Sequence, residues 1–92
     1  ISNVHSLRRG AAEAIEVIAH GDAHSSKVVG RRLDEIKLPD GVTIGTIVRG
    51  DEVVIAHRHV VVETDDHVIL FLVDRKKISQ VEKLFAVGFG FF

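Results

Sequence analysis

The strongest constraint on the fold is the stretch Leu38–Asp74, which is rich in valine and isoleucine and is interrupted only where the backbone must reverse. Short apolar runs of this kind, separated by proline, glycine or aspartate, are typical of strands joined by turns. We therefore expect successive strands in the order Val42–Arg49, Glu52–Ala56, a short stretch over His59–Glu63, and Val68–Val73.

The connection between the first two of these strands indicates a tight hairpin. Only Gly50-Asp51 separates them, and a two-residue loop with glycine first is typical of a type II′ turn. The last run, Val68–Val73, is apolar on both of its faces. Such a strand fits a central position in the sheet, or a face that packs against a partner.

Two helices are expected beside the strands. Apolar residues recur with helical spacing between Lys27 and Ile36, just after the potential capping residues Ser25 and Ser26. Pro39 would end this helix, because the residue before a proline disfavours the α conformation.

The second helix is expected over Arg75–Phe85, with Asp74 as its N-cap. Near the other end of the chain, the β-branched residues that follow Glu13 favour a strand up to Ala19. We expect residues 1–12 to be a lead-in without regular structure, residues 13–86 to form the domain and residues 87–92 to be an aromatic tail. The predicted fold class is α+β, with a small mixed, mainly antiparallel sheet of four to five strands and two helices.

The composition limits the function classes that remain. A chain of 92 residues makes one domain and buries only about 60–65% of the surface that its unfolded form exposes, so burial against a partner would help it. The formal net charge of −1 argues against nucleic acid as a partner. There is no cysteine, which excludes disulfides and thiolate metal sites. No apolar run is long enough for a membrane span, so we expect a soluble chain. Methionine is also absent and the first residue is Ile1, so we expect a piece of a longer polypeptide.

No residue pattern in the chain indicates catalysis, a metal or a bound cofactor. His57 and His59 alternate onto one face of an extended segment, but zinc needs three or four ligands and no further ligand motif completes a set. Arg49-Gly50-Asp51 matches an adhesion tripeptide, yet the predicted hairpin already explains all three residues. The serines lie at capping positions, and the glycines never form a phosphate-binding pattern. We therefore expect no catalytic, metal-binding or cofactor-binding residues here, and no enzyme.

The order and spacing of short motifs along nearly the whole chain carry a family resemblance. The chain resembles the C-terminal domain family of regulators of potassium conductance, the TrkA C-terminal domain family. The matching residues are Val4–Glu16, Val28–Arg31, Asp34–Pro39, Gly41, Ile44-Gly45, Val48-Arg49-Gly50, Asp66–Ile69, Phe71-Leu72, Val81-Glu82 and Leu84-Phe85.

The chain departs from the family pattern at two places. Asp65 stands where the family usually has a glycine, and aspartate enters the left-handed region more easily than most residues. Ala56-His57 stands where the family often has a proline after the second hairpin strand.

The resemblance implies a non-catalytic cytosolic regulatory domain that forms a homodimer and acts on a membrane potassium transporter through its parent chain. NAD or ATP would bind a separate nucleotide-binding domain of that parent, and not these residues. In some relatives a small effector, cyclic di-AMP among them, lies in a cleft between two copies. The polar residues that the hairpin places best for such a cleft are Arg49, His57, Arg58 and His59. The implied location is the cytoplasm, at the inner face of the cell membrane.

Two other interpretations stay open from the sequence. The chain could be an oligomerisation module without a ligand, or a fragment of a metal- or nucleotide-using enzyme whose other residues lie elsewhere. A ligand that raises the melting temperature would favour a regulatory domain over a bare oligomerisation module. Metal bound to the purified protein would favour the enzyme fragment.

Overall fold

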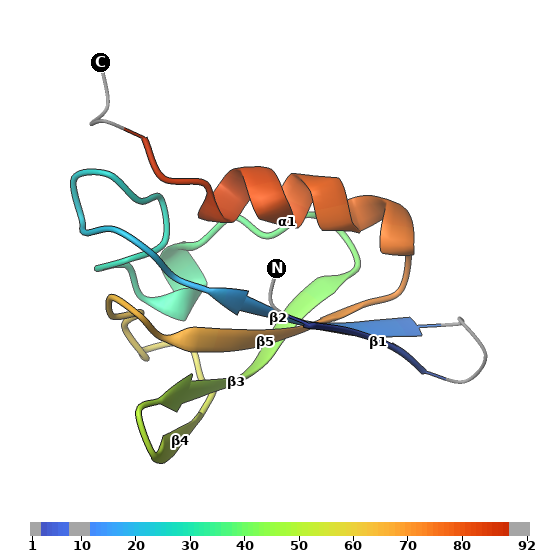
Figure 1. Cartoon of the computed structure of the whole chain (residues 1–92), viewed down its shortest axis with the longest axis horizontal. Helices are drawn as coiled ribbons and strands as arrows, with labels where there is room; N and C mark the ends of the chain where they lie inside the picture. The colour runs from blue at the N-terminus through green and yellow to red at the C-terminus, as the bar shows by residue number, and fades with distance from the viewer. Residues whose placement is uncertain (1–2, 8–11, 89–92) are drawn as a thin grey trace.

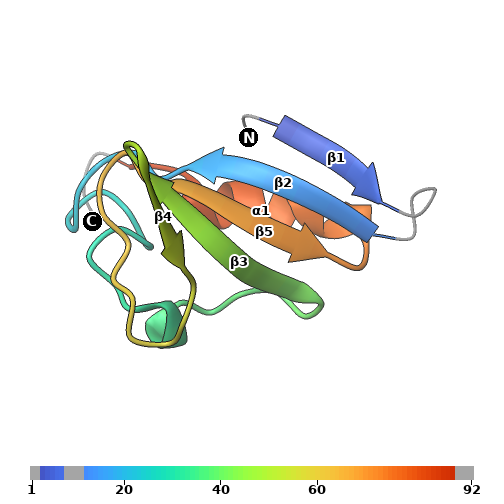
Figure 2. The ribbon, with the colours of Figure 1, turned by 90° about the horizontal axis from the view of Figure 1, so that it is seen from below.

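The computed structural model describes residues 3–7 and 12–88 of the chain. It contains a five-stranded sheet in the order β1-β2-β5-β3-β4, in which all four strand pairings are antiparallel. The helix α1 lies across one face of this sheet, and no helix of the described residues lies over the opposite face (Figures 1 and 2). The elements are β1 (Asn3–Leu7), β2 (Ala12–Ile18), η1 (Leu33–Glu35), β3 (Val42–Arg49), β4 (Glu52–Ile55), β5 (His67–Leu72), η2 (Arg75–Lys77) and α1 (Ile78–Phe85).

The predicted hairpin and the predicted central strand are both confirmed. Strands β3 and β4 pair from Thr46 to Arg49, and Gly50 has a φ of +59°, which suits the first position of a type II′ turn. Strand β5 lies in the middle of the sheet, between β2 and β3. The strand expected from about Glu13 is also present, as β2.

The core lies between the sheet and α1. Every second residue of β2 and β5 is buried on this side, and Val81 and Phe85 of α1 pack against them. The predicted cap at Asp74 is present at the start of η2, which leads into α1, because the Asp74 side chain accepts a hydrogen bond from the Lys76 amide at 2.9 Å. The buried aliphatic residues of this cluster are Ile15, Val17, Val28, Val29, Ile36, Val42, Ile47, Val62, Val68, Leu70, Leu72 and Val81.

The helix predicted over Lys27–Ile36 was wrong, and with it the count of two helices. This segment forms turns and the three-residue helix η1, and α1 is the one α-helix among the described residues. Gly30 has a φ of +82°, which ends any helical turn there, and its amide donates to the Val62 carbonyl at 2.8 Å. The side chains that suggested a helical face, such as Val29 and Ile36, are buried all the same.

Three further expectations concern the lead-in, the stretch after the hairpin and the aromatic tail. The lead-in was expected to lack regular structure, but Asn3–Leu7 forms the edge strand β1 and pairs with β2, so this expectation was wrong. The stretch expected over His59–Glu63 is reduced to an isolated bridge between Val61 and Arg32. Most of the aromatic tail, from residue 89 on, lies outside the described residues.

An ion pair between a half-buried arginine and a fully buried aspartate fixes the far end of β3 to the chain before β5. The Arg49 guanidinium donates to both carboxylate oxygens of Asp66, through Nε and Nη2 at 2.9 Å each, and Nη2 also donates to the Val61 carbonyl. Its Nη1 lies 2.8 Å from Glu63 Oε2. The Asp66 side chain is fully buried, and its hydrogen bonds to Arg49 raise the pKa of that arginine above its usual value. Asp65, which precedes Asp66, has a φ of +69°, so the expected left-handed conformation of this aspartate is confirmed.

We predict that Arg49→Ala lowers the free energy of unfolding by about 3 kcal/mol, because it leaves the buried Asp66 carboxylate with the Glu63 amide but without its charged partner. The matched control is Arg32→Ala, which removes an equally well-aligned but exposed pair with Asp34 and should cost no more than about 1 kcal/mol. Urea denaturation of both variants measures the difference. Equal losses for the two would contradict a structural role for the buried pair.

A β-bulge in β3 is filled by an aromatic ring. The pairing of β3 with β5 shifts between Ile44 and Thr46, which leaves Gly45 in the bulge. The ring of Phe71 packs on Gly45 from the face away from α1, where a Cβ at position 45 would overlap Cε2 of that ring. Glycine is therefore required here by the close approach of the ring, and not by a left-handed backbone.

We predict that Gly45→Ala costs about 1 kcal/mol or more of stability, because the new methyl group displaces the Phe71 ring. In a Phe71→Ala background the same substitution should cost clearly less. Thermal or urea unfolding of the four proteins of this double-mutant cycle gives the coupling energy. If the stability losses of the two single variants add up to that of the double variant, the Phe71 ring does not pack on Gly45 in solution.

Candidate functional site

A pocket of about 240 Å³ lies at the edge of the sheet, where the chain leaves β4. One wall is the short helix η1 with the residues that follow it, another is the start of β3, and the third is the loop after β4. The lining residues are Leu33, Asp34, Leu38, Thr43, Ile44, Ala56, His57 and Arg58. Two of the four residues predicted to contact a ligand, His57 and Arg58, therefore line this pocket.

Backbone hydrogen bonds hold the loop after β4 against η1. The amides of Leu33 and Asp34 donate to the carbonyls of Val60 and Arg58, at 2.9 and 3.1 Å. Within the loop, the Val60 amide donates to the His57 carbonyl at 3.1 Å and closes a turn. Because these bonds use main-chain groups, the side chains of residues 57–59 are left to point outward from the turn.

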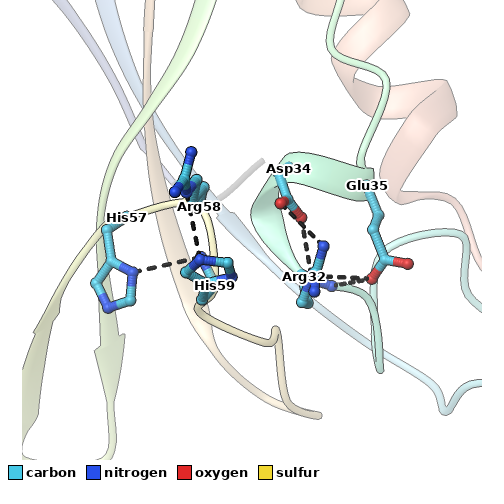
Figure 3. A network of polar contacts seen from close by, with 6 residues as sticks. All are labelled: Arg32, Asp34, Glu35, His57, Arg58 and His59. Carbon is cyan, nitrogen blue, oxygen red and sulfur yellow. Dashed lines mark hydrogen bonds and ion pairs between the residues drawn. The ribbon is translucent and has the colours of Figure 1, made fainter.

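Those three side chains contact one another (Figure 3). The His59 amide donates to Nδ1 of His57 at 3.3 Å, and the Arg58 Nε donates to Nε2 of His59 at 3.2 Å. The two rings meet edge to face, with centroids 6.3 Å apart. In this arrangement one nitrogen of each imidazole is already engaged as a hydrogen-bond acceptor.

The charges around the pocket are unevenly balanced. Arg32 takes both oxygens of Asp34, through Nε and Nη2 at 3.0 Å each, and its amide donates to Glu35 at 2.9 Å. The carboxylates of η1 are thus matched by Arg32. Among the described residues, no carboxylate lies within ion-pair distance of the Arg58 guanidinium, whose hydrogen bond goes to His59. A positive charge without a local partner at the rim of a pocket favours an anionic ligand.

The structure does not bring Arg49 to this group. Strand β4 separates them, because Arg49 pairs with Glu52 at its first residue and the loop begins after Ile55 at its last. Each nitrogen of the Arg49 guanidinium already contacts Asp66, Glu63 or Val61 within the fold. The arrangement therefore gives Arg49 a structural task at a distance from the pocket.

Sequence reasoning missed six of the eight lining residues, and Ala56 was assigned only to the second strand of the hairpin. Leu33, Asp34 and Leu38 were assigned to a helix or its end, and Thr43 and Ile44 were treated only as strand residues. Pro39 was correctly expected to mark a turn. The sequence did not show that this turn places the preceding segment beside β3. An expectation of turns around Gly30 would have exposed the segment as a candidate wall.

Two further observations concern ligands and membranes. Among the described residues no group of three or more histidine, cysteine, aspartate or glutamate side chains is placed to hold a metal ion. Within the same part of the chain, no helix has the length and apolar character needed to cross a bilayer.

Comparison with known proteins gives a family and several relatives. The model of the TrkA-C domain family matches residues 22–86. The chain is 67% identical over its whole length to a Trk system potassium uptake protein TrkA of Halomonas elongata, and 66% identical over 92% of its length to the protein of that name from Vibrio alginolyticus. The Haemophilus influenzae protein of that name is 47% identical over 92% of the chain. The chain spans about a fifth of the length of these curated relatives.

A solved structure has the same fold. The chain of S. agalactiae BusR in complex with its busAB-promotor DNA superposes on 91% of this chain with a TM-score of 0.66, over 40% of its own length. The sequences are 22% identical, so this likeness concerns the fold alone. The family match covers most of the sheet, the pocket and the helix, and the chain belongs to the TrkA-C domain family.

Proposed function

We propose that this chain is a non-catalytic regulatory domain of a Trk potassium uptake system, which pairs with a second copy and binds a small effector. The observation that carries this proposal is the 67% identity along the whole chain to a protein named Trk system potassium uptake protein TrkA. At such identity the buried residues and the pocket walls are expected to be shared. No constellation of nucleophile and base was found in the sequence, which supports a regulatory and not a catalytic role.

The rest of the parent protein would supply the other parts of the function. The relatives are about five times as long as this chain, so the proposed nucleotide-binding domain, with NAD or ATP, would lie outside it. Contact with a membrane potassium transporter subunit would be made by the parent assembly, on the cytoplasmic side of the membrane. This domain would contribute the pairing and the effector site.

The pocket supports an anionic effector that is held between two copies. Its volume of about 240 Å³ is below the roughly 300–1,000 Å³ of complete small-molecule sites, so a second surface is needed to enclose a larger ligand. Arg58 would supply positive charge to the ligand, and His57 and His59 would supply hydrogen bonds. Arg49 would act only indirectly, by fixing the chain that leads into β5.

An effector of this kind would act by shifting populations. If it binds one arrangement of the paired domains more tightly than another, the parent assembly moves toward that arrangement by the difference in binding free energy. The loop after β4 would transmit such a change to η1, because the amides of Leu33 and Asp34 donate to its carbonyls.

We predict that the chain can replace the matching segment of the Halomonas elongata relative. The chimera, expressed in a strain that lacks its own copy of that protein, should restore growth at limiting potassium, because the core and the pocket would be preserved. The control is the same parent with the segment deleted. A chimera that is expressed in full and grows no better than this control would contradict a role in potassium uptake.

We predict that Arg58→Ala weakens binding of cyclic di-AMP, the probe suggested by the family resemblance, by about 10- to 100-fold, as expected for loss of a charged hydrogen bond. Isothermal titration of the 92-residue chain measures this. Lys83→Ala, which removes a cation from the exposed side of α1, should leave the affinity unchanged. Equal affinities for the wild type and Arg58→Ala would contradict a ligand contact by Arg58, and no binding by the wild type would favour a module without this ligand.

A further inference from the structure

Three consecutive cations precede an exposed serine at the start of α1, on the outside of the molecule (Figure 1). In the sequence Arg75-Lys76-Lys77-Ile78-Ser79 they stand four, three and two residues before the serine. η2 runs directly into α1, and Lys77 at the junction has helical angles, with φ −76° and ψ −10°. Residues three and four apart share a face of a helix, so Arg75 and Lys76 lie on the same side as Ser79. Lys83 follows on that side one turn later.

The hydroxyl group of Ser79 has no structural task among the described residues. Ser79 is exposed, and no hydrogen bond joins its side chain to another residue of the described part of the chain. The neighbouring capping role is already filled by Asp74. By contrast, Ser26 Oγ accepts from the amides of Val28 and Val29, at 3.0 Å each, and Ser25 Oγ donates to Asp22 Oδ1 at 3.1 Å. Ser79 is therefore a hydroxyl that can be modified without breaking a contact of the fold.

The cations around Ser79 are not neutralised by the fold. Across residues 3–7 and 12–88, no carboxylate lies within ion-pair distance of Lys76, Lys77 or Lys83. Arg75 makes only a long contact, with its Nε 3.9 Å from Glu13 Oε1, and its side chain is 70% exposed. Within residues 74–85 four cations stand beside two carboxylates, a net charge of +2 in a chain whose net charge is −1. This surplus favours an anion at Ser79.

We propose that Ser79 is a phosphorylation site, whose co-reactants are ATP and a serine kinase that selects basic residues before the serine. The Ser79 Oγ forms a bond to the γ-phosphorus of ATP, and the bond from that phosphorus to the β–γ bridging oxygen breaks. ADP leaves, and the hydroxyl proton passes to the base of the kinase. This inference goes beyond the proposed function and does not depend on the effector pocket.

The segment can enter the cleft of a kinase without unfolding the core. Access to the residues on both sides of the serine requires the first turn of α1 to open. No residue of η2 is buried, and the buried residues of α1 are Val81 and Phe85, both beyond Ser79. Opening of residues 75–79 therefore leaves these two side chains in place, and helix ends open locally at a small cost in free energy.

A phosphate on Ser79 would stabilise the start of α1. It carries a charge of about −1.5 to −2 at neutral pH, and negative charge in the first turn of a helix interacts favourably with the helix dipole. Arg75 and Lys76 would donate charge-assisted hydrogen bonds to its oxygens. The net charge of +2 over residues 74–85 would fall to about zero. Phosphorylation would thus change which charged surfaces this side of the domain can contact.

The test treats the 92-residue chain, which has its own core, with magnesium ATP and the catalytic subunit of a cyclic-AMP-dependent protein kinase, an enzyme that selects such basic residues. Mass spectrometry should locate the phosphoryl group on Ser79, and the Ser79→Ala variant should receive none there. The double variant Lys76→Ala/Lys77→Ala should react at least about 10-fold more slowly, because two charged contacts to the kinase are lost. The matched control Lys83→Ala, which removes a cation after the serine, should react as fast as the wild type.

Thermal unfolding then compares the phosphorylated and unmodified chains. The melting temperature should rise by about 3 °C on phosphorylation at low ionic strength, and this gain should shrink in about 1 M salt, which screens the charges. A phosphorylated chain that melts at an unchanged or lower temperature would contradict the contacts of the phosphate with Arg75 and Lys76. The proposal is overturned by a chain that takes no phosphate on Ser79, by equal modification of Ser25 or Ser26, or by a rate that does not depend on Lys76 and Lys77.

Discussion

The backbone pairing between residues 30–34 and residues 58–62 is the interaction on which the rest of this domain depends. Gly30 and Val62 bond across it, and the amides of Leu33 and Asp34 donate to the loop after β4. Each such bond contributes only about 0.5–1.5 kcal/mol net. Together they hold the segment of residues 27–36, whose apolar residues have helical spacing, as a set of turns packed on the core. They also place the loop of residues 57–59 beside the pocket. Core formation and site formation are thus one event in this chain.

The sheet divides the molecule into two faces with different tasks. The face toward α1 is buried by the domain itself, with Val81 and Phe85 of the helix filling the space over β2 and β5. The opposite face presents apolar side chains that the domain leaves uncovered, as expected when a chain of this length cannot bury all of its apolar surface alone. Two arginines beside the strands have different roles. Arg49 at the end of β3 fixes the chain before β5 through Asp66, whereas Arg58 after β4 is directed outward.

The parts of the structure that sequence reasoning could predict are those set by neighbouring residues. The hairpin at Gly50, the cap at Asp74 and the left-handed Asp65 follow from local backbone preferences. The segment around Gly30 could not be predicted in this way, because the same spacing of apolar residues serves a helix or a set of turns against the core. The task of Arg49 was equally hidden, since Asp66 lies 17 residues away in the chain. For the same reason only the loop side of the pocket was anticipated, and the side formed by Leu33 and Leu38 was not.

Amide hydrogen exchange of the unliganded chain at neutral pH, followed residue by residue by NMR, tests most directly whether this pairing builds the site. Slow exchange is predicted for the amides of Gly30, Leu33 and Asp34 and for that of Val62, with the carbon chemical shifts of residues 27–32 outside the helical range. Helical shifts through this segment, or exchange of the Leu33 and Asp34 amides as fast as in an unstructured peptide, would contradict the account.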